Sequence, residues 1–220
     1  MRPSRHLKST PAPRSFSVAA FLRAATALIF LASLALTIFA NSLAAQQSHV
    51  TVTRTAAPEK RLDFEVTVPA AIPEVWEALS TSKGLSTWLF PNAVVDLRPG
   101  GDWIVKFPGG STGGGTIIAF APQQKLEIAA LAPDQFPTVR RERTHATFEL
   151  RASADGKATI VHLTQTGWKS GEEWDKAYDY LAGGNAELLE SLRQRFVTGP
   201  VDWDAMFKQA QPSAATNPKQ

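Results

Sequence analysis

The stretch from Phe64 to Pro91 constrains the fold more than any other part of this 220-residue chain. Apolar and polar residues alternate from Phe64 to Val68, which is the period of a β-strand with one buried face. Pro73 then opens a short helix with an apolar stripe, and Gly84 separates it from a second short helix. A strand followed by two short helices predicts a sheet folded around a helix, with a cavity between them.

Residues 1–44 predict an export signal peptide. Positions 1–23 contain five Lys or Arg residues and no acidic residue. An uncharged apolar run follows from Ala24 to Ala40, and Ser42-Leu43-Ala44 then fits the pattern of a cleavage site. An uncleaved membrane anchor is the alternative, because a run of this length is near the lower limit for spanning a bilayer. In both cases we expect the domain to work outside the cytosol, in the periplasm or secreted. Residues 45–59 are polar and predict a spacer.

The charge of the chain resides in this leader. The net charge is +3, from 23 basic and 20 acidic residues. The leader holds five of the basic residues, which leaves 18 basic and 20 acidic residues, or −2, for the rest. A basic surface for nucleic acid or anionic lipid is therefore not expected, and a membrane is expected as a partner only through an uncleaved leader. The chain has no Cys, so an exported domain of this kind relies on its core instead of disulfides.

The middle of the chain predicts a series of antiparallel strands. Turn residues separate the alternating patterns, most clearly Asp155-Gly156 between the last two. The glycine run 109–115 predicts a hairpin loop, and residues 132–141 predict a loop because they contain two prolines. The expected strands are Ala93–Leu97, Asp102–Phe107, Thr116–Phe120, Leu126–Leu131, Thr144–Arg151 and Ala158–Thr166.

One long helix is expected after the strands, from Gly171 to about residue 197. Leu181, Leu188 and Leu192 lie on its apolar stripe, so we expect each to be buried. Gly183-Gly184 sits mid-helix, where each Gly costs about 1 kcal/mol relative to Ala. That cost suggests a kink or a close approach to the sheet, and it predicts that Gly184→Ala lowers stability. Residues 198–220 predict a mostly disordered tail with one docking turn at Trp203–Phe207.

The order of these elements resembles the START-like (SRPBCC, helix-grip) superfamily over residues 60–197. Within it, the chain is similar to the group related to Aha-type activators of heat-shock-protein ATPase. The resemblance implies an α+β fold in which a curved antiparallel sheet wraps around a long C-terminal helix, with two short helices after the first strand. The chain differs from the group where Gly183-Gly184-Asn185 replaces the usual Gly-Trp of the final helix. The motifs that carry the resemblance are V-W-E-A-L-S-T-S-K-G-L-S-T-W-L (75–89), L-R-P-G-G-D-W (97–103), G-G-T-I-I-A-F-A-P-Q-Q-K-L (114–126) and A-T-I-V-H-L-T-Q-T-G-W (158–168).

The sequence offers no catalytic or metal-binding set. With a two-residue turn at Asp155-Gly156, His162 falls opposite Glu149 on the outer face of the sheet, and no third metal ligand joins His145 and His162. No Ser lies in a nucleophile motif, and the glycine run lacks the helix and Lys of a phosphate cradle. The basic run Arg140–Arg143 opens a strand, either as a solvated edge or as an anion gate at a cavity mouth. We therefore expect no metal and no cofactor.

Five residues from separate segments are the candidates for contact with a ligand. Gln165 continues the inward alternation of Val161 and Leu163, so its polar group points toward an apolar interior. There it can orient a ligand or simply bond a nearby backbone group. The aromatic candidates can wall a cavity or fill it. The five are Trp88, Trp103, Phe107, Phe148 and Gln165.

These observations predict an exported protein that holds a small apolar or amphipathic molecule between its sheet and the helix 171–197. A protein-interaction module, similar to a co-chaperone, is the first alternative, and it makes a protein partner the ligand. A START-like enzyme of the cyclase or hydratase kind is the second alternative. The absence of a visible acid–base pair in the sequence favours binding over catalysis.

Overall fold

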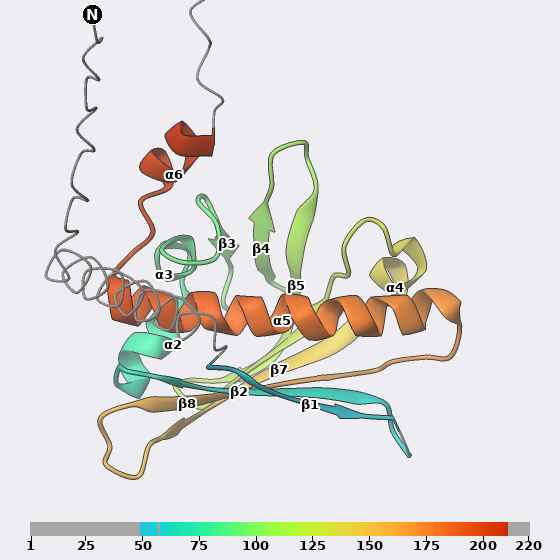
Figure 1. Cartoon of the computed structure of the whole chain (residues 1–220), viewed down its shortest axis with the longest axis horizontal. Helices are drawn as coiled ribbons and strands as arrows, with labels where there is room; N and C mark the ends of the chain where they lie inside the picture. The colour runs from blue at the N-terminus through green and yellow to red at the C-terminus, as the bar shows by residue number, and fades with distance from the viewer. Residues whose placement is uncertain (1–48, 57, 211–220) are drawn as a thin grey trace, which may run out of the picture. The chain divides into compact units, whose positions relative to one another are not determined.

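The computed structural model describes residues 49–56 and 58–210. The predicted signal peptide (1–44) and the end of the tail (211–220) lie outside the described residues. The described part has an α+β helix-grip fold, in which the long helix α5 (Glu172–Thr198) crosses one face of a curved antiparallel sheet (Figure 1). This confirms the fold class expected from the order of elements.

The sheet has eight strands in the order β1-β2-β8-β7-β6-β5-β4-β3, and every neighbouring pair is antiparallel. Neighbouring strands in the sheet are also consecutive in the chain, except where β2 pairs with β8. The strands are β1 (Thr51–Thr55), β2 (Arg61–Val68), β3 (Val94–Val95), β4 (Asp102–Lys106), β5 (Thr112–Ala121), β6 (Lys125–Ala130), β7 (Thr144–Ala152) and β8 (Thr159–Thr166).

The predicted alternation of β2 is confirmed, since Phe64, Val66 and Val68 are all buried. The spacer expected at 45–59 is wrong in part, because Thr51–Thr55 forms the edge strand β1 along β2. The strand is almost wholly exposed, so it carries none of the buried alternation by which strands are found. Its β-branched residues and its backbone bonds to β2 hold it instead.

Two short helices follow β2, as the sequence predicts: α2 (Ile72–Ser80) and α3 (Ser82–Ser86). The expected separation at Gly84 is wrong, because the two helices meet at Thr81 and Gly84 lies inside α3. The Thr81 hydroxyl accepts a hydrogen bond from the backbone N–H of Gly84 at 2.9 Å, which caps α3. Any side chain at Gly84 would overlap the backbone of Glu77 in α2. This glycine therefore allows the two helices to pack at close range.

Part of the glycine run belongs to a strand, although the sequence predicts a loop for all of it. Residues 113–115 belong to β5 and not to a hairpin loop. Gly114 has a φ of +100°, and a Cβ there would overlap the carbonyl oxygen of Trp103 on β4. A Cβ at Gly115 would overlap the carbonyl oxygen of Ala129 on β6. The glycines thus let β5 lie close to both neighbours, which a pattern of side chains does not reveal.

The loop expected at 132–141 is also wrong in part, because helix α4 occupies Pro137–Glu142. The Glu173 carboxylate of α5 accepts hydrogen bonds from the backbone N–H groups of Thr138 (2.6 Å) and Val139 (3.1 Å). The N-terminus of α4 is thus capped by a residue distant in sequence, so no local capping signal exists. The basic run 140–143 therefore lies in α4 and at its end, and it does not open a strand.

The hairpin of β7 and β8 has the register that the Asp155-Gly156 turn predicts, with Glu149 opposite His162. The imidazole of His162 nevertheless bonds Asp63, and not the Glu149 that lies opposite it. Its Nε2 lies 3.2 Å from Asp63 Oδ1 on the neighbouring strand β2. The pairing across β2 and β8 depends on the fold and not on the hairpin, so the turn alone could not predict it.

Helix α5 has two apolar faces instead of one. The face toward the sheet buries Ala182, Leu189 and Leu192. Leu192 was expected to be buried and is, but Leu181 and Leu188 are only half-buried, against expectation. They lie on an adjoining face of the helix, toward a cavity described below.

Helix α5 continues without a break through its glycine pair. A Cβ on Gly183 would meet no atom within 4 Å, and one on Gly184 would meet only Tyr180 Cε1 at 4.0 Å, an ordinary contact. The expected steric reason for a loss of stability in Gly184→Ala is therefore wrong.

The beginning of the tail is ordered further than expected, because α6 spans Trp203–Ala210. The Trp203 indole N–H donates to the carbonyl oxygen of Ser86 at 2.6 Å. The ring of Phe90 lies 5.6 Å from that of Trp203 and 6.0 Å from that of Phe207, measured between centroids. The turn expected at Trp203–Phe207 is thus a docked helix whose aromatic residues hold it beside α3.

Candidate functional site

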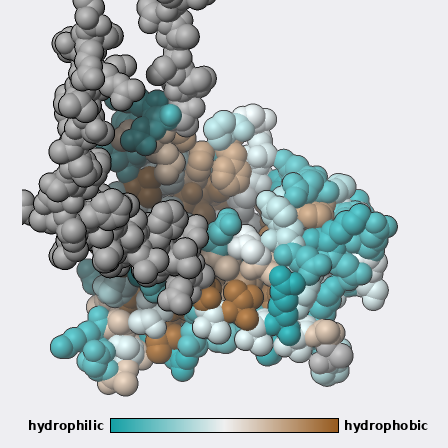
Figure 2. Space-filling model, in the orientation of Figure 1, coloured by the Kyte–Doolittle hydropathy of each residue, from teal (hydrophilic) through white to brown (hydrophobic). Residues whose placement is uncertain are grey.

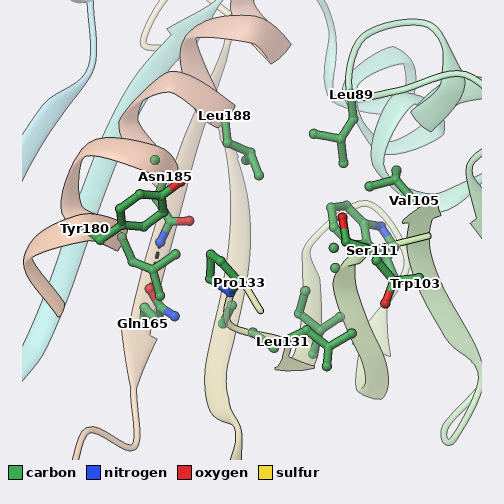
Figure 3. A pocket seen from close by; sticks show the side chains of 18 of the residues that line it. Leu89, Trp103, Val105, Ser111, Leu131, Pro133, Gln165, Tyr180, Asn185 and Leu188 are labelled. Carbon is green, nitrogen blue, oxygen red and sulfur yellow. Dashed lines mark hydrogen bonds between the residues drawn. The ribbon is translucent and has the colours of Figure 1, made fainter. Parts of the chain in front are cut away.

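A cavity of about 420 Å³ lies between α5, the strands β4 to β8 and the segment 131–135 (Figure 3). Apolar side chains from the inward positions of the strands form most of its wall. These positions follow the two-residue period of each strand, so the fold that buries the core also lines the cavity. The strand residues on its wall include Trp103, Val105, Ile128, Ala146, Phe148 and Leu163.

Four of the five candidate residues converge on this cavity: Trp103, Phe107, Phe148 and Gln165. The rings of Trp103 and Phe148 lie 5.9 Å apart between centroids and form a continuous aromatic wall. Phe107 is 38% exposed and lies toward the opening, where its ring meets that of Phe90 at 5.0 Å. Convergence in one cavity is thus shown for these four, while ligand contact stays a prediction.

Trp88 does not line the cavity. It is buried in the core, and its indole N–H donates to the carbonyl oxygen of Ala78 at 2.9 Å. Trp103 makes the equivalent bond to the carbonyl oxygen of Leu79, at 2.7 Å. Both indoles therefore satisfy carbonyl groups at the C-terminal end of α2, where the helix itself provides no partner. Trp88 has this structural role only, whereas Trp103 also presents its ring to the cavity.

Gln165 links the sheet to the helix. Its Nε2 donates to the Thr144 hydroxyl at 2.7 Å, and its Oε1 accepts from Nδ2 of Asn185 on α5, also at 2.7 Å. Thr144 and Gln165 are 1% and 3% exposed. The alternative that the amide bonds a nearby backbone group is wrong, because both partners are side chains. The amide is buried in an apolar setting and uses both of its ends within the protein.

Asn185 is a cavity residue that sequence reasoning missed. Its side chain lies beside Gln165 on the wall formed by α5 (Figure 3). Among the described residues, its Oδ1 has no hydrogen-bond partner, so this oxygen is an acceptor available to the cavity. A signal did exist, since Asn185 belongs to the Gly-Gly-Asn segment that departs from the usual Gly-Trp. The cavity face of α5 consists of Tyr180, Leu181, Gly184, Asn185 and Leu188.

Arg140 braces the segment that closes one side of the cavity. Its guanidinium donates to the carbonyl oxygen of Ala132 (2.5 Å) and to both the carbonyl (3.0 Å) and the hydroxyl (2.8 Å) of Thr112. It also pairs with Asp134 at 3.0 Å. Thr112 and Asp134 line the cavity, so Arg140 ties β5 to the segment 131–135. An anion gate at the mouth was one expectation for this run, but the donors of Arg140 are already used by the protein.

Arg143 is the other partly enclosed cation of this run. Burial lowers the pKa of its guanidinium, and the nearby charge of Arg140 lowers it further. Within the described part of the chain, its buried Nη1 has no hydrogen-bond partner. It is not among the residues that line the cavity.

The described residues contain no cluster of three or more His, Cys, Asp or Glu side chains suited to a metal ion. Of the described side chains that line the cavity, Asp134 alone is a carboxylate, and it pairs with Arg140. His145 is exposed, and His162 bonds Asp63 away from the cavity. The cavity wall is therefore mostly apolar, with a few polar side chains that include Ser111, Gln135 and the pair of Gln165 and Asn185. Over residues 49–56 and 58–210, no helix has the length and apolar character needed to cross a membrane.

Comparison with solved structures supports the fold. Protein MLL2253 from Mesorhizobium loti is similar with a TM-score of 0.54 and 18% identity, over 64% of this chain and 99% of that chain. The Aha1 protein from Colwellia psychrerythraea, solved as a dimer, has a TM-score of 0.52 and 18% identity, over 63% and 97%. CalU16 from Micromonospora echinospora has a TM-score of 0.50 and 19% identity, over 74% and 91%. At these identities the likeness shows the fold alone.

Comparison by sequence identifies the family. A search of curated proteins finds no match. The family model described as "Activator of Hsp90 ATPase homolog 1-like protein" matches residues 69–196, which is more than half of the chain and runs from the end of β2 to the end of α5. This confirms the START-like, Aha-type resemblance of the sequence motifs. The chain therefore belongs to the family of Activator of Hsp90 ATPase homolog 1-like proteins.

Proposed function

We propose that this protein binds a small amphipathic molecule with a ring system in the cavity between α5 and the sheet. The observation that carries the proposal is an apolar cavity of about 420 Å³ with the Asn185 amide on its wall. Ligand sites are typically cavities of about 300–1,000 Å³ with apolar walls and a few placed polar groups. The aromatic residues Trp103 and Phe148 favour a ring, because flat groups stack on such surfaces.

The polar contact with the ligand comes from Asn185 in this proposal, and Gln165 holds Asn185 in place. Both ends of the Gln165 amide are already bonded, to Thr144 and to Asn185. The Asn185 Oδ1 accepts a bond from an N–H or O–H group of the ligand. Water reaches this oxygen in the free protein, since it is not one of the buried side-chain atoms that lack a partner among the described residues. A ligand that covers the oxygen without supplying a donor leaves it unpaired, so a ligand with a donor binds better than one without.

Binding of 1-N-phenylnaphthylamine tests this proposal, since this probe has flat rings and one N–H donor and fluoresces in apolar sites. We expect saturable binding, with quenching of Trp emission because Trp103 lies on the wall. Leu188→Trp should reduce binding at least tenfold by filling the cavity, because one misfit group in an apolar pocket costs about 10–200-fold. Val197→Trp is the control, since Val197 is 52% exposed on the same helix. Equal binding by parent and Leu188→Trp would place the probe elsewhere and contradict the proposal.

Export is a further part of the proposed function. It is supported by the charge, apolar run and Ser42-Leu43-Ala44 of the leader, which lies outside the described residues. Protein isolated from the native host should begin near Ala45 when its N-terminus is sequenced. A full-length chain in the cytosolic fraction would contradict export, and a full-length chain in the membrane fraction would identify an uncleaved anchor.

A protein-interaction module is the second candidate. Exposed apolar residues favour it, because Phe107 and Phe207 are each 38% exposed and Met206 is 48% exposed. Figure 2 shows apolar residues gathered beside α6 on the visible face. The family description also names activators of an ATPase. Native mass spectrometry of protein from its own host distinguishes the two: a bound small molecule supports the first proposal, and a bound protein without one supports the second.

A further inference from the structure

The cavity face of α5 has a recess at its centre. Tyr180, Gly184 and Leu188 follow one another at four-residue spacing, so they lie above one another on the same side of the helix. Tyr180 and Leu188 present large side chains (Figure 3). Gly184, between them in the helix, presents only backbone. Asn185, with its available oxygen, borders the recess.

The fold itself gives no reason for glycine at this position. Gly184 lies inside a continuous helix, and its φ is not in the left-handed region that favours glycine. An added Cβ would meet only Tyr180 Cε1, at 4.0 Å. By contrast, Gly84, Gly114 and Gly115 each prevent overlap with a neighbouring backbone. Glycine is the least favourable helix residue after proline, and neither Gly183 nor Gly184 improves the packing of the helix. Gly184 differs from Gly183 because it lines the cavity.

We propose that Gly184 is a specificity-determining residue: its bare backbone seats one face of the ligand's ring, while the ligand's N–H or O–H group reaches Asn185 Oδ1. This inference rests on the proposed binding function and defines its ligand class as flat, ring-bearing molecules with a donor at one edge. A flat ring fits a recess between two large side chains, whereas a branched, three-dimensional skeleton collides with Tyr180 and Leu188. A side chain at position 184 occupies the volume that the ring uses.

The neighbouring Gly183 provides a matched control. It lies on the exposed side of the helix, does not line the cavity, and has no atom within 4 Å of an added Cβ. Gly183→Ala and Gly184→Ala should therefore each raise the melting temperature by about 2–4 °C through the same gain in helix propensity. This shared result shows that both variants fold, and it leaves ligand binding as the property in which they differ.

The decisive test compares Gly184→Leu with Gly183→Leu for binding of 1-N-phenylnaphthylamine. We expect Gly184→Leu to bind at least tenfold more weakly than the parent, and Gly183→Leu to bind within about twofold of it. Competition by 1-naphthol should exceed that by 1-methoxynaphthalene, and Asn185→Leu should remove this preference for the donor. If the parent binds the probe and Gly184→Leu binds it equally well, the recess does not seat the ring and the inference is overturned. If the parent does not bind the probe, the binding function itself fails.

Discussion

Replacing Leu189 by alanine is expected to lower the free energy of unfolding by about 2–5 kcal/mol, the range for removing a buried leucine side chain. Leu189 is fully buried on the face of α5 that packs on the sheet, in one core cluster with Phe64 and Val66 of β2. The substitution removes contacts between α5 and the sheet. It also leaves a void, which a close-packed core fills poorly.

The adjacent Leu188→Ala variant is the matched control. Leu188 is half-buried and faces the cavity, so its removal enlarges a space that already exists instead of creating one. We expect a loss of about 1 kcal/mol or less for this variant, since it removes only partial burial. Urea denaturation of both variants measures the difference. Equal losses would mean that the two faces of α5 are packed alike and that the cavity at Leu188 is closed in solution.

This pair of leucines shows how far the sequence predicts the helix. The apolar spacing correctly predicts α5 and its position over the sheet, because one face of the helix must be buried. It assigns burial to Leu188 and overlooks Leu189, which is the buried one, because an apolar side chain suits a packed core and a cavity wall equally. That distinction depends on how far the opposing strands stand from the helix, which no local pattern records.

The sequence likewise predicts some features of the strands and of the other elements, but not all of them. The Asp155-Gly156 turn fixes the register of β7 and β8, so the inward direction of Phe148 and Gln165 could be predicted. The helix α4 and the strand β1 could not be, because each is stabilised by distant partners. Glu173 caps α4, and β2 supplies the backbone bonds of β1.

The sequence predicts the aromatic residues of the candidate site, but not the residues that α5 contributes to it. Large aromatic residues at inward positions of strands, such as Trp103 and Phe148, have few roles other than core or cavity. Trp88 is an equally large aromatic residue, but its indole N–H donates to the carbonyl oxygen of Ala78. It therefore stabilises the end of α2 and does not line the cavity. Asn185 departs from the usual Gly-Trp of the final helix, but only its bond to Gln165 and its place on the cavity wall show that it faces inward.

Gln165→Leu is expected to lower the free energy of unfolding by about 1–3 kcal/mol, the cost of leaving buried polar groups unpaired. An inward amide contributes little to packing, so the expected loss has to come from its hydrogen bonds. The structure gives it two short hydrogen bonds, and its partner Thr144 is 1% exposed and has no access to water as a substitute. Leucine has a similar volume, so the expected loss arises from the unpaired partner and not from a void.

A double-mutant cycle with Thr144→Val separates this cost from other effects of the leucine. When both residues are apolar, no buried hydroxyl is left unpaired, so the double variant should recover much of the stability lost in Gln165→Leu. Binding of 1-N-phenylnaphthylamine should nevertheless stay at least tenfold weaker in the double variant, because Asn185 has lost the amide that orients it. Such an outcome assigns Gln165 a positioning role for Asn185 in addition to its structural role. If binding recovers together with stability, Asn185 does not need Gln165 to hold its position, and the positioning role of Gln165 is contradicted.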